Sequence, residues 1–464
     1  MGDADISDRM PARIILSEVL AALSYALDLT DGQAEGHTMR SALIGMRLGR
    51  EAELDTEQRS ALYYTLLLKD AGCSSNSARL CQLFGTDDRT LKPGMRVVDW
   101  QDKKSLAVAT LRMSAFGGKM SEKVRHFLGI AQAENVVRET MLVRCERGAE
   151  IVERLGFPRE TALAVRHLDE HWNGKGNPDT LAGTEIPLAS RIANIAQTVE
   201  IFHHRTGING ALKMLRQRRK TWFDPDLADL VLEWRNDVAW WERLSRSDLA
   251  AEVVAEEPAS YTRWVSEDGL DTIAQAFADI IDAKSPFTYS HSRNVASYAL
   301  AIARTLGMDA MEQRKIYRAG LLHDIGKLGV SNTILDKAGP LTDGERAAVE
   351  KHPLHTWEIL SRVPAFREFA WPAALHHERL DGTGYPWRVS AGRLDMTARI
   401  LSVADVYEAL SADRPYRAGL SWRQTSSIMQ RGNGTSFDPM ILEALTSCVR
   451  TETPMAGLEP RAAA

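Results

Sequence analysis

The stretch AGLLHDIGKLG, residues 319–329, places His323 and Asp324 inside an otherwise apolar helical segment. An unpaired charge there would be costly, and a bound metal ion would remove that cost. Successive helical residues differ in direction by about 100°, so both side chains can reach one ion while the second carboxylate oxygen reaches another. Lys327 follows on the same helical face, where its ammonium is suited to a phosphate oxygen or to protonating a leaving oxygen.

Helical spacing of apolar residues continues on both sides of this stretch, as in Leu270, Ile273 and Phe277 of residues 269–285. Strand patterns are scarce, so the sequence predicts an all-α protein. A chain of 464 residues is too long for one ordinary core, which favours two or three domains.

The composition is that of an ordinary soluble protein, with 44% hydrophobic and 26% charged residues. The net charge of −5 argues against broad nucleic-acid binding. No apolar run reaches membrane-spanning length, the N-terminus lacks a signal pattern, and the four cysteines lack CxxC spacing. We therefore expect a reduced, cytoplasmic protein with no membrane partner and no direct nucleic-acid partner.

Further histidines and carboxylates in the C-terminal half suggest a metal centre. A single histidine is more often a surface or core residue, so the prediction depends on the whole set. Imidazole and carboxylate ligands together suit Mn, Fe, Ni or Zn. The candidate ligands are His291, His323, Asp324, His352, His376, His377 and Asp405.

Two short segments carry candidate substrate contacts. In HHERLDGTGYP, residues 376–386, the glycines permit a tight turn or a close approach to a ligand, and the proline fixes the exit direction. In DRPYR, residues 413–417, Arg414 and Arg417 are suited to a phosphate or a guanine edge. The alternative is that these arginines form ordinary ion pairs at the protein surface.

Together these motifs make residues 267–447 resemble the HD-GYP subgroup of the HD-domain metal-dependent phosphohydrolase superfamily. The matching segments are HSRNV, LLHDIGK, HHERLDGTGYP, ARILSVAD, DRPYR and GTSFDP. The resemblance implies an all-helical domain that hydrolyses cyclic di-GMP to pGpG, to GMP, or to both. A hydroxide bridged by metal ions would attack phosphorus.

The resemblance also implies roles for individual residues. One ion would be held by His291, His323, Asp324 and Asp405, and Asp324 would bridge to a second ion held by His352, His376 and His377. Lys327 and Asp324 would be catalytic, and substrate would contact Gly384, Tyr385 and Pro386, with Arg414 and Arg417. Two divalent ions are expected, with Fe or Mn favoured and Ni or Zn as alternatives.

The chain departs from the subgroup's pattern at three positions. Members with three metals carry a glutamate where this sequence has Phe287, so two ions are expected rather than three. Ser285 and Glu408 stand where aspartates are frequent, and these changes could weaken the support for the bridging hydroxide.

Residues 1–245 resemble a second, eroded copy of the same domain. GHTMR and LLKDAGC align with SHSRN and LLHDIGK at a spacing of 254 residues, whereas DEHWNGKGNP aligns with HERLDGTGYP at 208. The difference between these two spacings indicates an insertion in the N-terminal copy, at about residues 75–140. The copy keeps His37 and Asp70, but the other ligand positions hold Lys69, Arg144, Leu168, Asp169 and Gln197.

Two of seven ligands cannot hold a binuclear centre, so this degenerate copy is either a scaffold or a sensor. A scaffold would pack against the active copy or support a homodimer. A sensor would use Lys69 and Arg144 to bind an anionic ligand. Residues 246–266 are predicted as the linker and residues 448–464 as a C-terminal tail.

Two alternatives to cyclic di-GMP hydrolysis remain open. The enzyme could hydrolyse another cyclic dinucleotide, such as a cyclic GMP–AMP hybrid, or another nucleotide. The chain could instead be a nucleotide-binding signalling receptor with little turnover. The near-complete ligand set argues against a purely binding role.

Overall fold

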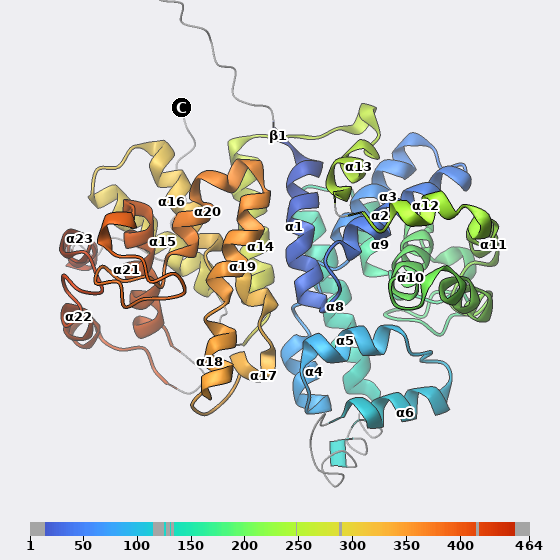
Figure 1. Cartoon of the computed structure of the whole chain (residues 1–464), viewed down its shortest axis with the longest axis horizontal. Helices are drawn as coiled ribbons and strands as arrows, with labels where there is room; N and C mark the ends of the chain where they lie inside the picture. Colours follow the sequence, from blue (N-terminus) through green and yellow to red (C-terminus); the bar gives the residue numbers. More distant parts are fainter. Residues whose placement is uncertain are drawn as a thin grey trace, which may run out of the picture.

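The computed structural model describes residues 14–114, 125–126, 130, 134–246, 248–286, 290–413 and 417–450. Helices dominate this part of the chain, which confirms the predicted all-α class (Figure 1). Within the same residues the only sheet is a short antiparallel pair of β1 (Ile14–Ile15) and β2 (Trp264–Val265).

The N-terminal half contains α1 (Leu16–Asp31), α2 (His37–Glu51), α3 (Thr56–Leu68), α4 (Ser77–Phe84), α5 (Asp88–Arg96), α6 (Lys103–Met113), α8 (Glu134–Arg154), α9 (Arg159–Arg166), η1 (Gly183–Glu185), α10 (Leu188–Arg218), α11 (Pro225–Glu233), η2 (Trp234–Asn236), α12 (Val238–Arg243), α13 (Leu249–Ala255) and η3 (Ala259–Tyr261).

The C-terminal half contains α14 (Glu267–Asp282), α15 (His291–Thr305), α16 (Ala310–Leu322), η4 (Ile325–Gly329), α17 (Asn332–Leu335), α18 (Asp343–Val349), α19 (His352–Arg362), η5 (Pro364–Phe366), α20 (Arg367–Ala374), η6 (Ala391–Arg393), α21 (Met396–Ser411), α22 (Trp422–Gln430) and α23 (Pro439–Arg450).

Several helices of the two halves begin at matching positions of the sequence. Helices α2 and α15 are both 15 residues long, and helices α3 and α16 are both 13 residues long. Asp55 caps α3 and Asp309 caps α16, each in a capping box that satisfies backbone N–H groups at the helix start. The proline that ends each Gly-rich turn, Pro178 or Pro386, follows a cis peptide bond.

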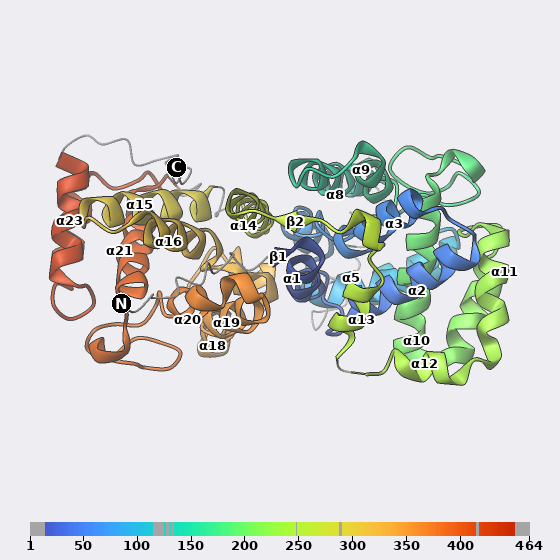
Figure 2. The ribbon, with the colours of Figure 1, turned by 90° about the horizontal axis from the view of Figure 1, so that it is seen from above.

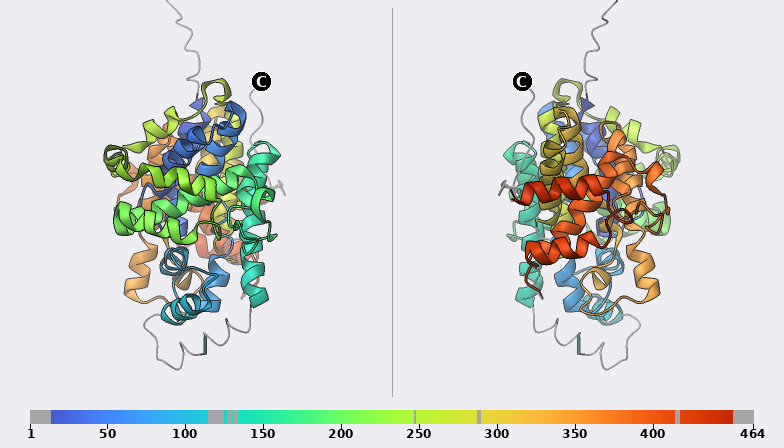
Figure 3. Two further views of the ribbon diagram at one scale, coloured as in Figure 1. Left: turned by 90° about the vertical axis from the view of Figure 1, so that its right-hand side faces the viewer. Right: turned by 90° about the vertical axis from the view of Figure 1, so that its left-hand side faces the viewer.

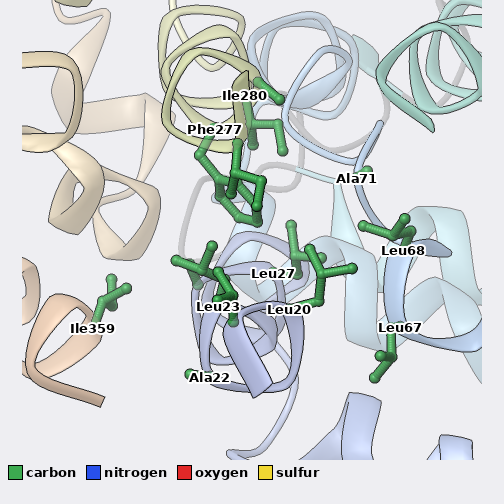
Figure 4. Packing of buried hydrophobic residues seen from close by; sticks show 14 of the residues in the cluster. Leu20, Ala22, Leu23, Leu27, Leu67, Leu68, Ala71, Phe277, Ile280 and Ile359 are labelled. Atoms are coloured by element: carbon green, nitrogen blue, oxygen red, sulfur yellow. The ribbon is translucent and has the colours of Figure 1, made fainter. Parts of the chain in front are cut away.

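The two halves lie side by side along the long axis of the molecule, with α1 and α14 between them (Figures 1 and 2). Figure 3 shows the helices of each half from its own end. One buried hydrophobic cluster runs through both halves. At its centre, Leu23 and Leu27 of α1 lie near Phe277 and Ile280 of α14 (Figure 4), so the junction between the halves is part of the core.

The segments expected to be a linker and an insertion contain ordered helices. In residues 246–266, α13 packs on α1 and α2 and buries Leu249 and Val253, because its apolar residues recur at helical spacing. The described parts of the insertion include α4, α5, α6 and the start of α8. The predicted tail begins within α23, and residues 451–464 lie outside the described residues.

None of the described helices is long and apolar enough to cross a membrane.

Candidate metal centre

The predicted ligands reach the centre from five different helical segments. His291 is the first residue of α15, and Asp405 lies within α21. His323 follows the last residue of α16, and Asp324 precedes η4. His352 begins α19, while His376 and His377 follow α20. Most ligands therefore stand at helix ends, where the backbone leaves the helix and neighbouring helices converge.

All seven ligands belong to overlapping groups of close donor atoms. Asp324 groups with His352, His376 and His377, and it also groups with His291 and His323. A third group joins His323 and His376 to Asp405. Within each group the ligand atoms lie within 4.8 Å of one another.

The two carboxylate oxygens of Asp324 face different histidines. Oδ2 lies 3.3 Å from His291 Nε2 and 3.3 Å from His323 Nε2. Oδ1 lies 3.2 Å from His352 Nε2 and 3.6 Å from His376 Nε2. Asp324 therefore stands between two sets of imidazole donors.

Asp405 lies close to His291, on the Oδ2 side of Asp324, and also approaches His377. Its Oδ1 lies 3.5 Å from His291 Nε2, and its Oδ2 lies 3.8 Å from His377 Nδ1.

The other ring nitrogen of four histidines is already engaged. The Nδ1 atoms of His323, His352 and His376 lie 2.7 Å from the carbonyl oxygens of Gly320, Val349 and Ala373. His291 Nδ1 instead lies 2.6 Å from a Glu408 carboxylate oxygen. Each arrangement turns Nε2 toward the centre, as in metal-ligating histidines generally.

The donor set fits metal ions. His291 Nε2, His323 Nε2 and Asp324 Oδ1 are buried polar atoms without a hydrogen-bond partner in the described residues. Buried polar atoms are rarely left without a partner. Imidazole nitrogens and carboxylate oxygens are ligands of first-row divalent metals, and a metal would satisfy all three atoms.

Burial and neighbouring charges set the protonation of the ligands. Burial and the charge of His352 lower the pKa of His377 to about 3. Burial also lowers the pKa of His352, and it lowers that of His376 well below the usual value. These three rings are therefore neutral at neutral pH, the form that binds metal.

His291 behaves differently because carboxylates surround it. Burial alone would lower its pKa, but the Asp324, Glu408 and Asp405 carboxylates raise it to about 10. Burial would also raise the pKa of Asp324, but His323, Lys327 and His291 hold it well below its ordinary value.

Lys327 and the Gly-rich turn adjoin the ligands. Lys327 Nζ forms an ion pair with Asp324. The Tyr385 ring stacks on the His377 ring at a centroid distance of 4.8 Å. A Cβ atom on Gly384 would lie 2.5 Å from the Glu378 Cα atom, so only glycine fits there.

Of the two arginines predicted to contact substrate, Arg417 alone belongs to the described residues. Arg417 donates to the carbonyl oxygens of Ala409 and Leu410 near the end of α21, at 2.8 and 3.2 Å. Arg414 and Phe287 lie outside the described residues. Ser285 Oγ donates to Asp336 Oδ1 at 2.5 Å.

Two acidic residues with a supporting role were not predicted. Glu378 accepts hydrogen bonds from the backbone N–H groups of Trp387, Arg388 and Val389, and so holds the segment after the Gly-rich turn. Asp282 accepts from Ser292 beside His291. Glu378 belongs to the HHERLDGTGYP motif, so the sequence could have indicated its role. The contacts of Asp282 depend on how α14 and α15 pack, which the sequence does not show.

In the N-terminal half, the charged residues that the sequence aligns with the ligands form ion pairs. Lys69 Nζ forms an ion pair with Asp70 and lies 3.1 Å from His37 Nε2. Arg144 forms an ion pair with Asp169. The side chains of these residues are at most 9% exposed.

Arg96, from the insertion, also enters this cluster. It contacts Asp70 and Asp31 at 3.0 Å each, and it donates to Gln197 Oε1 at 2.8 Å. Sequence comparison could not find Arg96, because the insertion has no counterpart in the second half.

The fold and the site define a class of protein. The HD domain family model matches residues 131–227 and 275–441. The chain belongs to this family, as a metal-dependent phosphohydrolase of the HD-GYP subgroup.

Several relatives in this family are named for the cyclic dinucleotide that they hydrolyse. The chain is 39% identical to the 3'3'-cGAMP-specific phosphodiesterase 3 of Vibrio cholerae, over 93% of this chain and 94% of that protein. It is 38% identical to a cyclic di-GMP phosphodiesterase of Pseudomonas aeruginosa, over 35% of this chain and 39% of that protein. The crystal structure of the V. cholerae cyclic GMP-AMP-specific phosphodiesterase V-cGAP3 superposes with a TM-score of 0.64 at 33% identity. It covers 95% of this chain and 98% of its own.

Proposed function

We propose that this protein is a metal-dependent phosphodiesterase that hydrolyses a cyclic dinucleotide. The arrangement of Asp324 between two sets of histidine donors carries the proposal, because it offers two adjacent positions for divalent ions. We propose two ions, Fe or Mn, held by the seven predicted ligands. Paired ions of this kind polarise a phosphate and activate water for in-line attack.

The residues of the chain itself would orient the substrate. Lys327 lies at the edge of the ligand cluster, where its ammonium can meet a phosphate oxygen or give a proton to the leaving oxygen. Tyr385 holds the His377 ring by stacking. Gly384 lets this turn approach the histidine pair closely. We assign no substrate contact to Arg417, whose guanidinium binds helix carbonyls.

For the substrate we propose 3'3'-cGAMP, with cyclic di-GMP as the second candidate. One relative named for 3'3'-cGAMP aligns along 93% of this chain and so shares both halves, while two others with that name align along 34% and 36%. Relatives named for cyclic di-GMP, such as those of P. aeruginosa and Xanthomonas campestris, align along 35% and 39%. The metals themselves do not select a base, since both substrates offer the same linkage.

We propose further that the N-terminal half is a degenerate copy acting as a scaffold. Lys69, Arg96 and Arg144 are each paired with buried carboxylates. These pairs use the positive charge that a sensor would need for an anionic ligand. Asp31, Asp70 and Cys73 also have donor atoms within 4.8 Å of one another, but Arg96 contacts all three, so a cation of the chain balances these buried aspartates.

The test compares two histidines of α19. Purified protein with Mn²⁺ or Fe²⁺ is given 3'3'-cGAMP and cyclic di-GMP, and the linear products are measured. We expect His352→Ala to lower kcat by about a thousandfold or more, since it removes a metal ligand. His355→Ala is the matched control, because His355 pairs with Glu358 instead. Intact substrates with the unaltered protein, or equal rates for both variants, would refute the proposal.

A further inference from the structure

A cavity of about 300 Å³ lies beside the metal centre. Lys327 lines the cavity and also pairs with Asp324, so the cavity adjoins the predicted metal ligands. Its other walls combine Lys337 with apolar residues such as Ile281 and Leu335. Lys337 pairs with Glu345, so the walls are chiefly apolar and suit the flat base of a nucleotide whose phosphate lies toward the metal centre.

The end of α14 and the short helix α17 meet at one wall of this cavity. Lys284 and Ser285 line it directly. Asn332, the first residue of α17, donates through Nδ2 to the Lys284 carbonyl oxygen at 2.6 Å and to Asp336 at 2.8 Å. The wall is therefore a hydrogen-bonded unit of the catalytic half.

A residue of the N-terminal half reaches into this wall. Asp88, the first residue of α5, accepts from Lys284 Nζ at 3.0 Å through Oδ2. Its Oδ1 accepts from the Asn332 backbone N–H, also at 3.0 Å. Asp88 is 0% exposed and Lys284 is 1% exposed. One carboxylate thus joins the two segments that form the wall.

Other contacts hold Asp88 in place. The Cys81 thiol donates to Oδ1 at 3.7 Å. The next residue, Arg89, donates to the Gly329 carbonyl oxygen at 2.5 Å, at the end of η4. Burial would raise the pKa of Asp88, but Lys284, Lys92 and the Asn332 N–H hold it well below its ordinary value, so the carboxylate is ionised.

A buried ion pair is an expensive way to join two surfaces. Apolar side chains of similar size would stabilise such a junction equally well or better, because both charges must leave water. What a paired carboxylate adds is direction, since its two oxygens fix the positions of two donors. In this wall the donors belong to Lys284 and Asn332.

We infer that Asp88 is a positioning residue for the proposed reaction: it reaches from the N-terminal half to fix the cavity wall against which the nucleotide of the substrate binds. This inference rests on the proposed function. It gives the insertion a role in substrate binding, exercised through Lys284 and Asn332 rather than by contact with the reacting atoms.

The experiment compares a large and a small phosphodiester. We expect Asp88→Asn to raise the KM for 3'3'-cGAMP about tenfold, because small misplacements in a binding site are costly. Hydrolysis of bis(p-nitrophenyl) phosphate, which needs the metal centre but not the wall, stays within about twofold. Metal content stays unchanged. Asp87→Asn, whose carboxylate caps α5 from outside the wall, is the control and keeps the KM of the unaltered protein.

A second variant distinguishes a loss of positioning from a loss of folding stability. Asp88→Asn leaves Lys284 as an unpaired buried charge, whereas Asp88→Asn with Lys284→Met removes both charges. The double variant is expected to melt near the unaltered protein and still to show the raised KM. If the KM stays normal in both variants, or both phosphodiesters slow equally, the positioning role is overturned. If the unaltered protein hydrolyses only bis(p-nitrophenyl) phosphate, the proposed function itself fails, and this inference with it.

Discussion

At the scale of single residues, the centre depends on groups that orient the ligands. Glu408 fixes His291 through Nδ1, and backbone carbonyls fix three other rings. Glu408 stands where an aspartate is frequent in the subgroup, a change that was expected to weaken the support for the bridging hydroxide. In the structure the carboxylate reaches Nδ1 at 2.6 Å, so the longer side chain still makes the contact.

We therefore predict that Glu408→Gln lowers metal affinity about 10- to 100-fold, the usual effect of losing a carboxylate behind a metal-bound histidine. Titration of the metal-free protein with Mn²⁺, followed calorimetrically, measures the change. Glu443→Gln on the exposed side of α23 is the control. Unchanged affinity in Glu408→Gln would mean that His291 does not need this partner.

At the scale of elements, the Gly-rich turn after α20 is held from both sides. Glu378 accepts three backbone hydrogen bonds from the residues that follow the turn, and Tyr385 stacks on His377. At Gly384 the turn touches the backbone of the histidine segment, so its shape and the position of His377 are linked.

We predict that Gly384→Ala lowers kcat/KM about a hundredfold, because the new methyl group would meet backbone atoms and displace His377. Gly392→Ala is the matched control, since a Cβ atom there meets nothing within 4 Å. Steady-state kinetics on both variants gives the comparison. Equal activity would show that the turn does not position the ligand.

At the scale of the whole molecule, the two halves differ in how they balance buried charge. Among the described residues of the C-terminal half, the unpartnered atoms His291 Nε2, His323 Nε2 and Asp324 Oδ1 lie among the predicted ligands. The N-terminal half collects ion pairs among Lys69, Arg96 and Arg144 and their aspartates. Both halves share one hydrophobic core through α1 and α14.

We predict that removing metal destabilises the halves unequally. A ligand that binds only the folded state stabilises it, so chelation should speed hydrogen exchange in segments around His291, His323 and Asp405. Segments around His37 and Asp70 should keep their protection. Hydrogen exchange with mass spectrometry, with and without a chelator, tests this. Equal loss of protection in both halves would contradict it.

The sequence by itself was enough for the helical class and the family, because apolar spacing and ligand motifs are local properties of the chain. It also supplied the seven candidate ligands, which stand in five short segments and which the structure brings together in groups of donor atoms within 4.8 Å of one another. It could not place Asp88 beside Lys284, nor Arg96 beside Asp70. Both contacts are made by the ends of α5, and only the packing of this helix in the N-terminal half places its first residue against the C-terminal half and its last residue beside Asp70.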